Sequence, residues 1–442
     1  MALRWTAAGM LEAERQFRKV IGYRDLATSS SRSNAITTVV ELTPTPLAPF
    51  VQLNTVPNGT CPLQPSSRAY LAATRGMTKL SWDQVLAFRL ERQFLHSRAP
   101  AGGLFEVASA LCGVRAQLPS TAELTLLARV EGLEQGEVQR ALEQERTLVK
   151  TWIRNVLHVV PADDLALYVA VLQEGPSDGW LRRRGVTRKQ YEAIIGNVPR
   201  ALDGRPRTRE QLADRLAELA GPDVREAVLF SWGGVLKQSA GFGDLCFGPP
   251  WGRNVTFVRP DRWLRRPLRS DPDEAGRELV RRVLAVYGPV SAVDFGHWIK
   301  QPAKAKALLR ASAEELTEVE VEGRSAWALT SDLPVLAGIR RPRGVRLLPA
   351  FDQWVTGPRP REAFVSPERV PLVFGQQGQV SPVLLVDGRA AGIWSHERRG
   401  DAIRVEVEPF DALSPKVRKA LSDEVERLAA FLGGSPELSL AT

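Results

Sequence analysis

A weak internal repeat is the feature that most constrains the fold of this chain of 442 residues. Three times a helix-rich stretch leads into two short β-rich segments, and each pair is followed at once by an Asp-containing helix start. The pairs read LVKTWI and VLHVV, DLCF and VTFV, and EVEV and SAWAL. Because Gly and Asn favour the positive φ of tight turns, the links at 154–155, 248–254 and 322–324 predict three β-hairpins.

Helical periods precede each hairpin. Apolar residues recur at helical spacing over 122–127 and 138–142, over 210–219, and over 292–299 and 305–309. Three helices followed by a hairpin are typical of a winged helix, whose third helix can enter a major groove while the hairpin contacts the DNA backbone or minor groove. Three copies at spacings of about 70–100 residues predict a tandem winged-helix array.

The chain beyond residue 338 has a different pattern. VRLLPAFDQWV, PVLLVDGRAAGIWS and DAIRVEVEPF alternate in the manner of β-strands, and the DG dipeptide at 387–388 is a strong hairpin turn. A terminal helix is predicted over 414–432, with a proline in its first turn and two glycines after its end. These patterns predict a small β-barrel or sheet closed by a helix.

The same patterns divide an α+β fold into five segments. We expect an extension over 1–77, winged-helix units over 78–175, 176–270 and 271–338, and the β-barrel with its helix over 339–442. The extension becomes rich in Ser, Thr and Pro after its first helical-looking piece and keeps no period, so we expect it to be largely disordered.

Composition excludes several classes of function. Hydrophobic residues make up 44% and charged residues 25%, and no apolar run approaches the roughly 18 residues of a membrane helix, so we expect a cytoplasmic chain that binds no membrane. The three cysteines and four histidines are scattered, so neither a disulfide framework nor a metal site is predicted. No P-loop, G-x-G-x-x-G, G-x-S-x-G or H-E-x-x-H occurs, so we expect no cofactor.

The net charge of +9 points toward nucleic acid, but the clustering of arginines is more informative than the sum. Residues 1–77 hold eight basic and four acidic side chains and so account for nearly half of the net charge. The remaining chain has arginine clusters around Trp180, around Trp263 and over 340–346. Because such runs are usually solvated surface, a DNA-binding face and an ordinary surface both stay open.

Six segments, in matching order over about residues 79–410, carry a family resemblance: LSWDQVLAFRLERQFL, LCGVRAQLPSTAEL, TWIRNVLHVVPADDL, RNVTFVRPDRWL, LLPAFDQWVTGPRPRE and PVLLVDGRAAGIW. Together they resemble the AlkZ/YcaQ-type family of bacterial winged-helix DNA glycosylases. The resemblance implies three winged helices in a C-shaped body with a β-barrel, and a monomer that binds damaged duplex DNA. It also implies hydrolysis of the N-glycosidic bond of bulky N7-alkylated purines or crosslinks. Separately, residues 4–26 resemble the C-terminal end of mutator-type transposases.

The family's catalytic signature is a short Q-x-Q or H-x-Q element, and the matching positions here read Arg115, Ala116 and Gln117. Gln117 fits this signature and Arg115 departs from it. An N7-alkylpurine is already cationic, so its departure needs no general acid, and an amide can orient water toward an oxocarbenium-like sugar. Gln117 and Arg115 are therefore the candidate catalytic residues. The alternative for Gln117 is a helix-terminal amide bonded to the backbone.

Further residues are candidate DNA contacts by charge or position, namely Arg154, His158, Arg253, Arg343, Arg346 and Asp352. Arg154 and His158 alternate on the first predicted hairpin and share one face with Trp152. His158 could equally be a structural histidine with satisfied hydrogen bonds, and Asp352 could instead pin the first turn of the barrel. Arg154 could also be simple surface.

Three tryptophans, Trp251, Trp263 and Trp298, are expected to pack in the core or against hairpins rather than to stack on bases. The leading hypothesis is a DNA glycosylase-like repair protein. The alternatives are a non-catalytic duplex DNA-binding protein of the same fold, regulatory or inactive, and a structural interaction module that binds no DNA.

Overall fold

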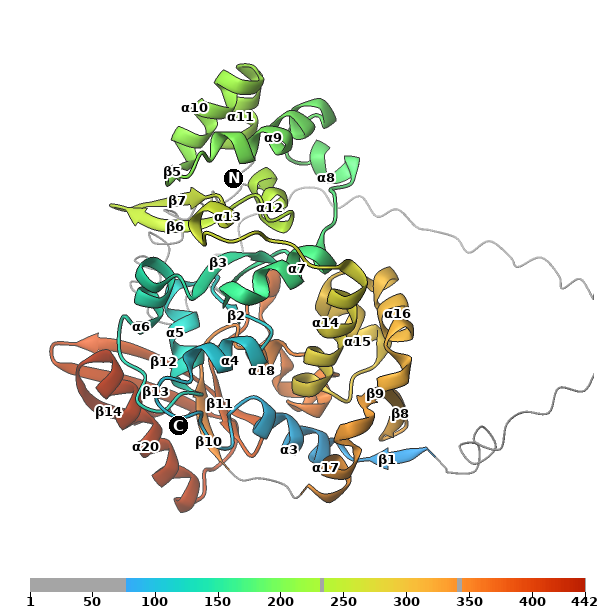
Figure 1. The fold of residues 1–442 in the computed structure, drawn as a ribbon. Coiled ribbons are helices and arrows are strands. Elements are labelled where there is room, and N and C mark those ends of the chain that lie inside the picture. The colour runs from blue at the N-terminus through green and yellow to red at the C-terminus, as the bar shows by residue number, and fades with distance from the viewer. Residues whose placement is uncertain (1–76, 231–233, 340–343, 442) are drawn as a thin grey trace, which may run out of the picture. The chain divides into compact units, whose positions relative to one another are not determined.

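The computed structural model describes residues 77–230, 234–339 and 344–441 (Figure 1). Contacts divide the chain into two units, Met1–Gly76 and Met77–Thr442. The extension, for which we expected disorder and a transposase-like stretch, lies outside the described residues except for Met77. The described part mixes helices with small sheets, so the predicted α+β class is confirmed (Figure 1). None of the described helices has the length and apolarity that crossing a membrane requires.

The first helix–hairpin unit follows the predicted order. Its elements are β1 (Thr78–Leu80), α3 (Trp82–Arg92), α4 (Leu104–Ala110), β2 (Val114–Arg115), α5 (Pro119–Leu127), α6 (Glu137–Arg140), β3 (Leu148–Ile153), β4 (Val156–Pro161) and α7 (Leu165–Leu172). The hairpin turns at Arg154 and Asn155, whose φ angles of 53° and 60° are the positive values that a two-residue turn requires. The short strand β2 pairs with β4 to give the sheet order β2-β4-β3.

The second unit repeats this arrangement with the sheet order β5-β7-β6. Its elements are α8 (Asp178–Arg182), α9 (Arg188–Ala201), β5 (Arg207–Thr208), α10 (Arg209–Ala220), α11 (Asp223–Phe230), α12 (Gly234–Gly241), β6 (Cys246–Trp251), β7 (Asn254–Val258) and α13 (Pro260–Trp263). Capping boxes begin α9 at Thr187 and α10 at Thr208, because each threonine has a glutamine three residues later. The unit has a hydrophobic core of its own.

The third unit departs from the other two in its short strand. Its elements are α14 (Pro272–Tyr287), α15 (Ala292–Ile299), α16 (Pro302–Ala311), β8 (Leu316–Val321), β9 (Arg324–Leu329) and α17 (Leu333–Gly338). A single bridge from Val290 to Trp327 of β9 stands where the other units have a short strand. In this unit β1, at the start of the described chain, pairs in parallel with the edge of β8 that does not contact β9.

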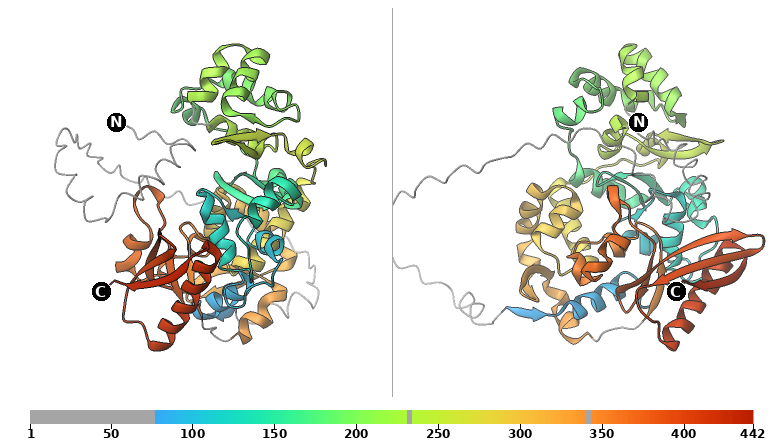
Figure 2. Two further views of the ribbon diagram at one scale, coloured as in Figure 1. Left: turned by 90° about the vertical axis from the view of Figure 1, so that its left-hand side faces the viewer. Right: turned by 180° about the vertical axis from the view of Figure 1, so that it is seen from behind.

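The chain after the third unit forms a five-stranded sheet of order β10-β11-β12-β13-β14. Its elements are β10 (Val345–Leu348), α18 (Gln353–Thr356), α19 (Val370–Val373), β11 (Val383–Val386), β12 (Arg389–Arg399), β13 (Ala402–Pro409), α20 (Pro415–Leu432) and β14 (Ser435–Leu440). The predicted β-barrel is wrong, because β10 and β14 are separate edges and no strand pairing among the described residues closes the sheet. Helix α20 packs against β10, β13 and β14, and Figure 2 shows it along this sheet.

Two local signals in this part of the chain are confirmed. Asp387 and Gly388 turn the β11–β12 hairpin with φ of 50° and 82°. Helix α20 begins after Ser414, whose hydroxyl accepts from the amide of Val417, and ends at Gly433 with φ of 69°. The strand β14 that follows was not predicted, and it pairs in parallel with β13.

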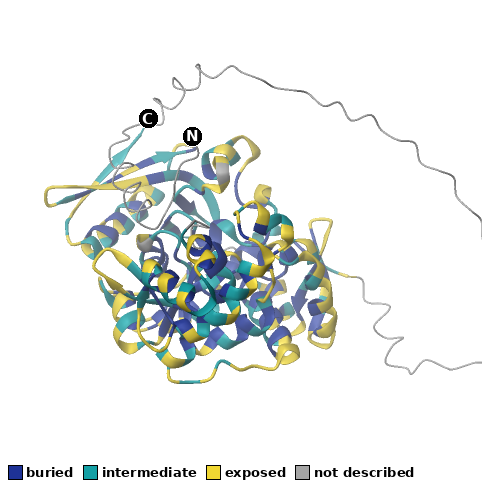
Figure 3. Ribbon diagram, turned by 90° about the horizontal axis from the view of Figure 1, so that it is seen from above, coloured by how far each residue is buried: buried dark blue, intermediate teal, exposed yellow. Residues whose placement is uncertain are grey.

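The hydrophobic cores extend across the predicted domain boundaries. One core joins the first unit to the five-stranded sheet and α20, for example through Leu126, Val405 and Leu428. Another joins the first hairpin and α7 to α14–α16 of the third unit. Figure 3 shows the buried residues concentrated in the interior, with exposed residues on the outer turns and loops. The boundaries at 175, 270 and 338 stay predictions.

Candidate active site

A cavity of about 190 Å³ lies between the first unit, the third unit and the segment after α18. Strand β2 and the β3–β4 hairpin form one wall, helix α15 and its C-terminal end form a second, and residues 356–359 form a third. The side chains on which its chemistry depends are Arg115, Arg154, His158, Trp298, Lys300 and Arg359. The sequence-predicted residues Arg115, Arg154 and His158 are therefore brought together.

Strand β2 places Arg115, the first residue of the Arg115–Ala116–Gln117 element, at this cavity. Arg115 lines it directly, and the pairing of β2 with β4 continues one step further, because the amide of Ala116 donates to the carbonyl of Leu157 at 2.9 Å. Gln117 is half-buried and follows at a bend, outside β2 and outside the residues that line the cavity.

The charge around Arg115 is positive. Burial, and then the neighbouring charge of Arg154, lower the pKa of the Arg115 guanidinium to about 10. Among the described lining residues Asp294 is the single carboxylate, and it accepts from the Ser291 hydroxyl at 2.6 Å and pairs with Arg324 at 3.8 Å. No ion pair joins Arg115 to a carboxylate within the described part of the chain, so the cavity keeps an excess of cations.

Arg154 and His158 interact with each other. The guanidinium of Arg154 stacks over the Trp298 ring, 3.8 Å from its centre, and donates to Nε2 of His158 at 2.7 Å. Nδ1 of His158 lies 2.9 Å from the carbonyl of Val156 and so carries the ring proton. Burial and the charge of Arg154 hold the pKa of His158 well below its usual range. His158 thus has both ring nitrogens engaged, and a DNA contact by either residue stays a prediction.

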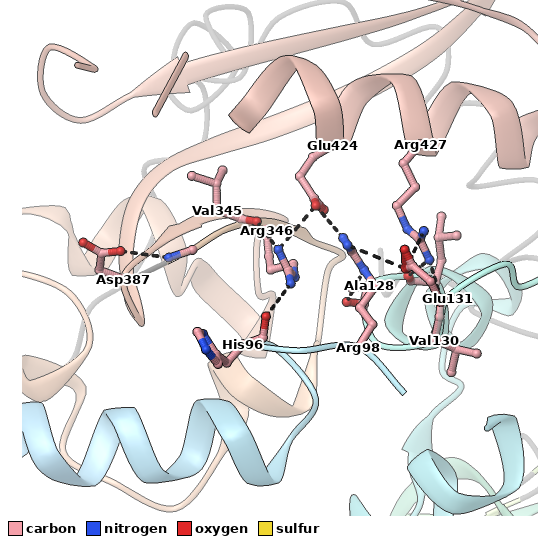
Figure 4. Close-up of polar contacts among 12 residues, drawn as sticks. His96, Arg98, Ala128, Val130, Glu131, Val345, Arg346, Asp387, Glu424 and Arg427 are labelled. Atoms are coloured by element: carbon pink, nitrogen blue, oxygen red, sulfur yellow. Dashed lines mark hydrogen bonds and ion pairs between the residues drawn. The ribbon is translucent and has the colours of Figure 1, made fainter. Parts of the chain in front are cut away.

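Arg346 lies away from this cavity, at a junction of charged side chains (Figure 4). Its guanidinium donates to the carbonyls of Val345 at 2.8 Å and His96 at 3.0 Å, and pairs with Glu424 of α20 at 3.4 Å. Arg98 pairs with the same carboxylate. Burial lowers the pKa of Arg346 to about 10. Arg346 therefore joins β10 to α20, and its role in DNA binding stays a prediction.

Asp352 is fully buried beside α18. Its two carboxylate oxygens accept from the Arg129 guanidinium at 2.7 and 2.8 Å, and one of them also accepts from the amide of Trp354 at 2.7 Å. It therefore caps the N-terminus of α18 and fixes that helix to the C-terminal end of α5. This geometry supports the structural alternative, while a DNA contact stays untested.

The remaining predicted residues lie apart from the cavity. Arg253 is exposed at the turn of the β6–β7 hairpin, and Arg343 lies outside the described residues. Trp298 is buried and Trp263 is half-buried, in line with the packing expected of them. Trp251 is 64% exposed, so the packing expected for it is wrong. An irregular register between Gly248 and Trp251 carries it to the hairpin tip.

Two cavity cations were missed by sequence reasoning. Lys300 caps the C-terminus of α15 with a φ of 63°, and Arg359 follows α18 in the motif GPRPRE. Neither belongs to a periodic pattern or to an arginine cluster in the chain, and only the fold brings them to Arg115. Among the described residues no group of three His, Cys, Asp or Glu side chains could hold a metal ion.

The fold and the site together define an α+β protein built from repeated helix–hairpin units, with a positively charged cavity between the first and the third unit. The family model described as DNA glycosylase AlkZ-like matches residues 108–431. An interstrand DNA cross-link repair glycosylase of Streptomyces sahachiroi is 34% identical over 372 residues, which are 81% of this chain and 98% of the relative. The structure of Streptomyces sahachiroi DNA glycosylase AlkZ matches with a TM-score of 0.75 and 32% identity, covering 82% of this chain and all of that one. The chain belongs to the AlkZ-like DNA glycosylase family and is a DNA glycosylase-like repair protein.

Proposed function

We propose that this protein, acting as a monomer, hydrolyses the N-glycosidic bond of bulky N7-alkylated purines or of crosslinks in duplex DNA. The observation that carries the proposal is the position of Arg115, the first residue of the Arg115–Ala116–Gln117 element, which β2 holds at the wall of a cationic cavity. The relative from Streptomyces sahachiroi, an interstrand DNA cross-link repair glycosylase, supports the choice of substrate.

The chemistry requires little from the protein beyond positioning. An N7-alkylated purine carries a positive charge, so it leaves with the electron pair of the glycosidic bond and becomes neutral. Water then adds to the oxocarbenium-like sugar carbon and releases its proton to solvent. The Gln117 amide can accept a hydrogen bond from this water and orient its oxygen.

We also infer that the three helix–hairpin units are winged helices that grip the duplex. In each unit a hairpin follows a set of helices, and a short strand or bridge pairs with the second hairpin strand. That order fits a helix entering a groove beside a hairpin on the backbone.

The second candidate is a duplex DNA-binding protein of the same fold without catalysis. Arg115 favours it, because this cation stands where the family signature has glutamine or histidine and no described carboxylate pairs with it. A fixed positive charge opposes the development of positive charge on the sugar.

One experiment separates the two candidates. The full chain is incubated with duplexes that contain N7-methylguanine or a nitrogen-mustard crosslink, and abasic sites are scored by alkaline strand cleavage. Release of the alkylated base supports the glycosylase. DNA binding without any release supports the non-catalytic protein, and the absence of both supports an interaction module.

A further inference from the structure

A lysine lines the same cavity as Arg115, and hydrolysis of the glycosidic bond does not require it. Lys300 follows the last residue of α15, and its φ of 63° is the left-handed conformation that ends this helix. It is exposed, and it belongs to the lining of the cavity. A substrate that enters the cavity can therefore reach its amino group.

The amino group of Lys300 is not engaged by the protein. Within the described part of the chain no carboxylate pairs with it and no hydrogen bond holds it. Asp294, the carboxylate among the described lining residues, is bound by the Ser291 hydroxyl at 2.6 Å and pairs with Arg324 at 3.8 Å. No described anion therefore holds the proton on Lys300.

The surroundings of Lys300 favour its neutral form. Partial burial, and then the like charges of Arg115 and Arg154, lower the pKa of this lysine. A lysine that is desolvated or lies beside another cation is a better nucleophile, because more of it is the free amine at neutral pH. The charge of Arg115, which opposes positive charge on the sugar, therefore favours a nucleophilic amine in the same cavity.

Two other described lysines have a lowered pKa, but neither lines this cavity. Burial lowers the pKa of Lys150 and of Lys237. Their amino groups lie over aromatic rings, 5.4 Å from the centre of Phe247 for Lys150 and 5.9 Å from that of Trp152 for Lys237. Lys300 is thus the described lysine that combines a lowered pKa with a place at the cavity.

We propose that Lys300 forms an imine with the open-chain sugar of an abasic site, and that the protein cleaves the DNA strand on the 3′ side of that sugar by β-elimination. The abasic site is the product of glycosidic hydrolysis, and its aldehyde is the electrophile that a free amine attacks. This strand cleavage goes beyond the proposed function and would follow it in the same cavity.

The reaction is balanced with water alone. The neutral amine adds to C1′ of the aldehyde, and the aldehyde oxygen leaves as water, so a C=N bond replaces the C=O bond. The imine acidifies the C2′ hydrogen, solvent water removes this proton, and the C3′–O bond breaks with its electron pair on the departing phosphate. Hydrolysis of the imine then returns the Lys300 amine.

The test uses the full chain, a labelled duplex with an abasic site prepared beforehand by removal of a uracil, and sodium borohydride, which reduces an imine to a stable amine. We expect a covalent adduct on a denaturing gel, and strand cleavage when borohydride is left out. Lys300→Arg keeps the positive charge but cannot form the imine, so it should lose both. Lys306→Arg, which changes an exposed lysine of α16 outside the cavity, should keep both.

Two further measurements make the result decisive. A duplex with a tetrahydrofuran analogue, which has no aldehyde, reports whether Lys300→Arg still binds. Digestion of the natural adduct and mass spectrometry identify the modified residue without any variant. A natural protein that binds the abasic duplex without forming the adduct, an adduct that persists in Lys300→Arg, or a modified residue other than Lys300 would overturn the proposal.

The outcome for Lys300 is separate from that for base release, because the abasic site is supplied ready-made. A natural protein that forms the adduct but releases no alkylated base refutes the proposed hydrolysis and leaves the role of Lys300 standing. Base release without an adduct refutes the role of Lys300 and leaves the hydrolysis standing.

Discussion

Arg115 is the residue at which this chain departs from the signature of its family, and its guanidinium faces the cavity. At about 5 Å and an effective dielectric constant near 20, a fixed unit charge beside the sugar adds at most about 3 kcal/mol to the barrier as positive charge moves from the purine to the sugar. We expect Arg115→Gln to raise single-turnover release of N7-methylguanine roughly a hundredfold and Gln117→Ala to abolish it. Rapid-quench assays at saturating enzyme measure both rates.

The opposite outcome for Arg115 has a defined meaning. If the natural protein releases the base rapidly and Arg115→Gln slows it, the electrostatic argument is wrong and the arginine positions the substrate. DNA affinity is measured alongside, so that a change in binding is separated from a change in the rate of base release.

The buried pair of Arg129 and Asp352 supports a prediction about stability. Both side chains are fully buried, so Asp352→Asn would leave the Arg129 guanidinium without its charged partner and weaken the cap of α18. We expect a loss of about 3–5 kcal/mol in the free energy of unfolding, measured by urea denaturation. Asp423→Asn breaks an exposed pair with Lys419 and should leave the denaturation midpoint unchanged. An equally small effect at both sites would contradict this reading of the pair.

At the scale of an element, the β6–β7 hairpin presents an exposed tip with Trp251 and Arg253. If this hairpin lies on the DNA backbone, Arg253→Ala should leave the melting temperature unchanged and reduce the salt dependence of binding by about one unit of slope. Fluorescence anisotropy across a salt series measures the slope. Arg253→Lys keeps the charge and should keep the slope, and an unaltered slope in Arg253→Ala would place the hairpin off the DNA.

For the whole molecule, the net charge of +9 and the arginine clusters predict binding to duplex DNA without dependence on base sequence. If about four to six phosphates are neutralised, the slope of log K against log salt should be roughly −4 to −5. Isothermal titration between low and moderate salt, with two unrelated duplexes, checks both the slope and the sequence independence. Undetectable or salt-insensitive binding would exclude both DNA hypotheses.

Signals carried by a few neighbouring residues were enough to predict many elements. The positive φ of Asn155, Asp387 and Gly388 turns hairpins where the sequence placed them, and Ser414 and Gly433 bound the terminal helix as expected. Such turns and caps are decided by local backbone geometry and local hydrogen bonds, which the sequence shows directly. The family resemblance then added residues 115–117 as the candidate catalytic element.

The site is made of residues that lie far apart in the sequence, and no local pattern predicts that they come together. Asp352 is paired with Arg129 in the core, and Arg359 lines the same cavity as Arg115 and Lys300 although none of them is near another in the sequence. The predicted barrel was wrong for a similar reason, because the pairing of strands is a long-range choice: β14 pairs in parallel with β13 across the length of α20, and β10 and β14 stay separate edges. The sequence by itself determined the repeated elements, their turns and the family. Only the tertiary structure decided which cations meet, because burial and desolvation arise when separate segments pack together.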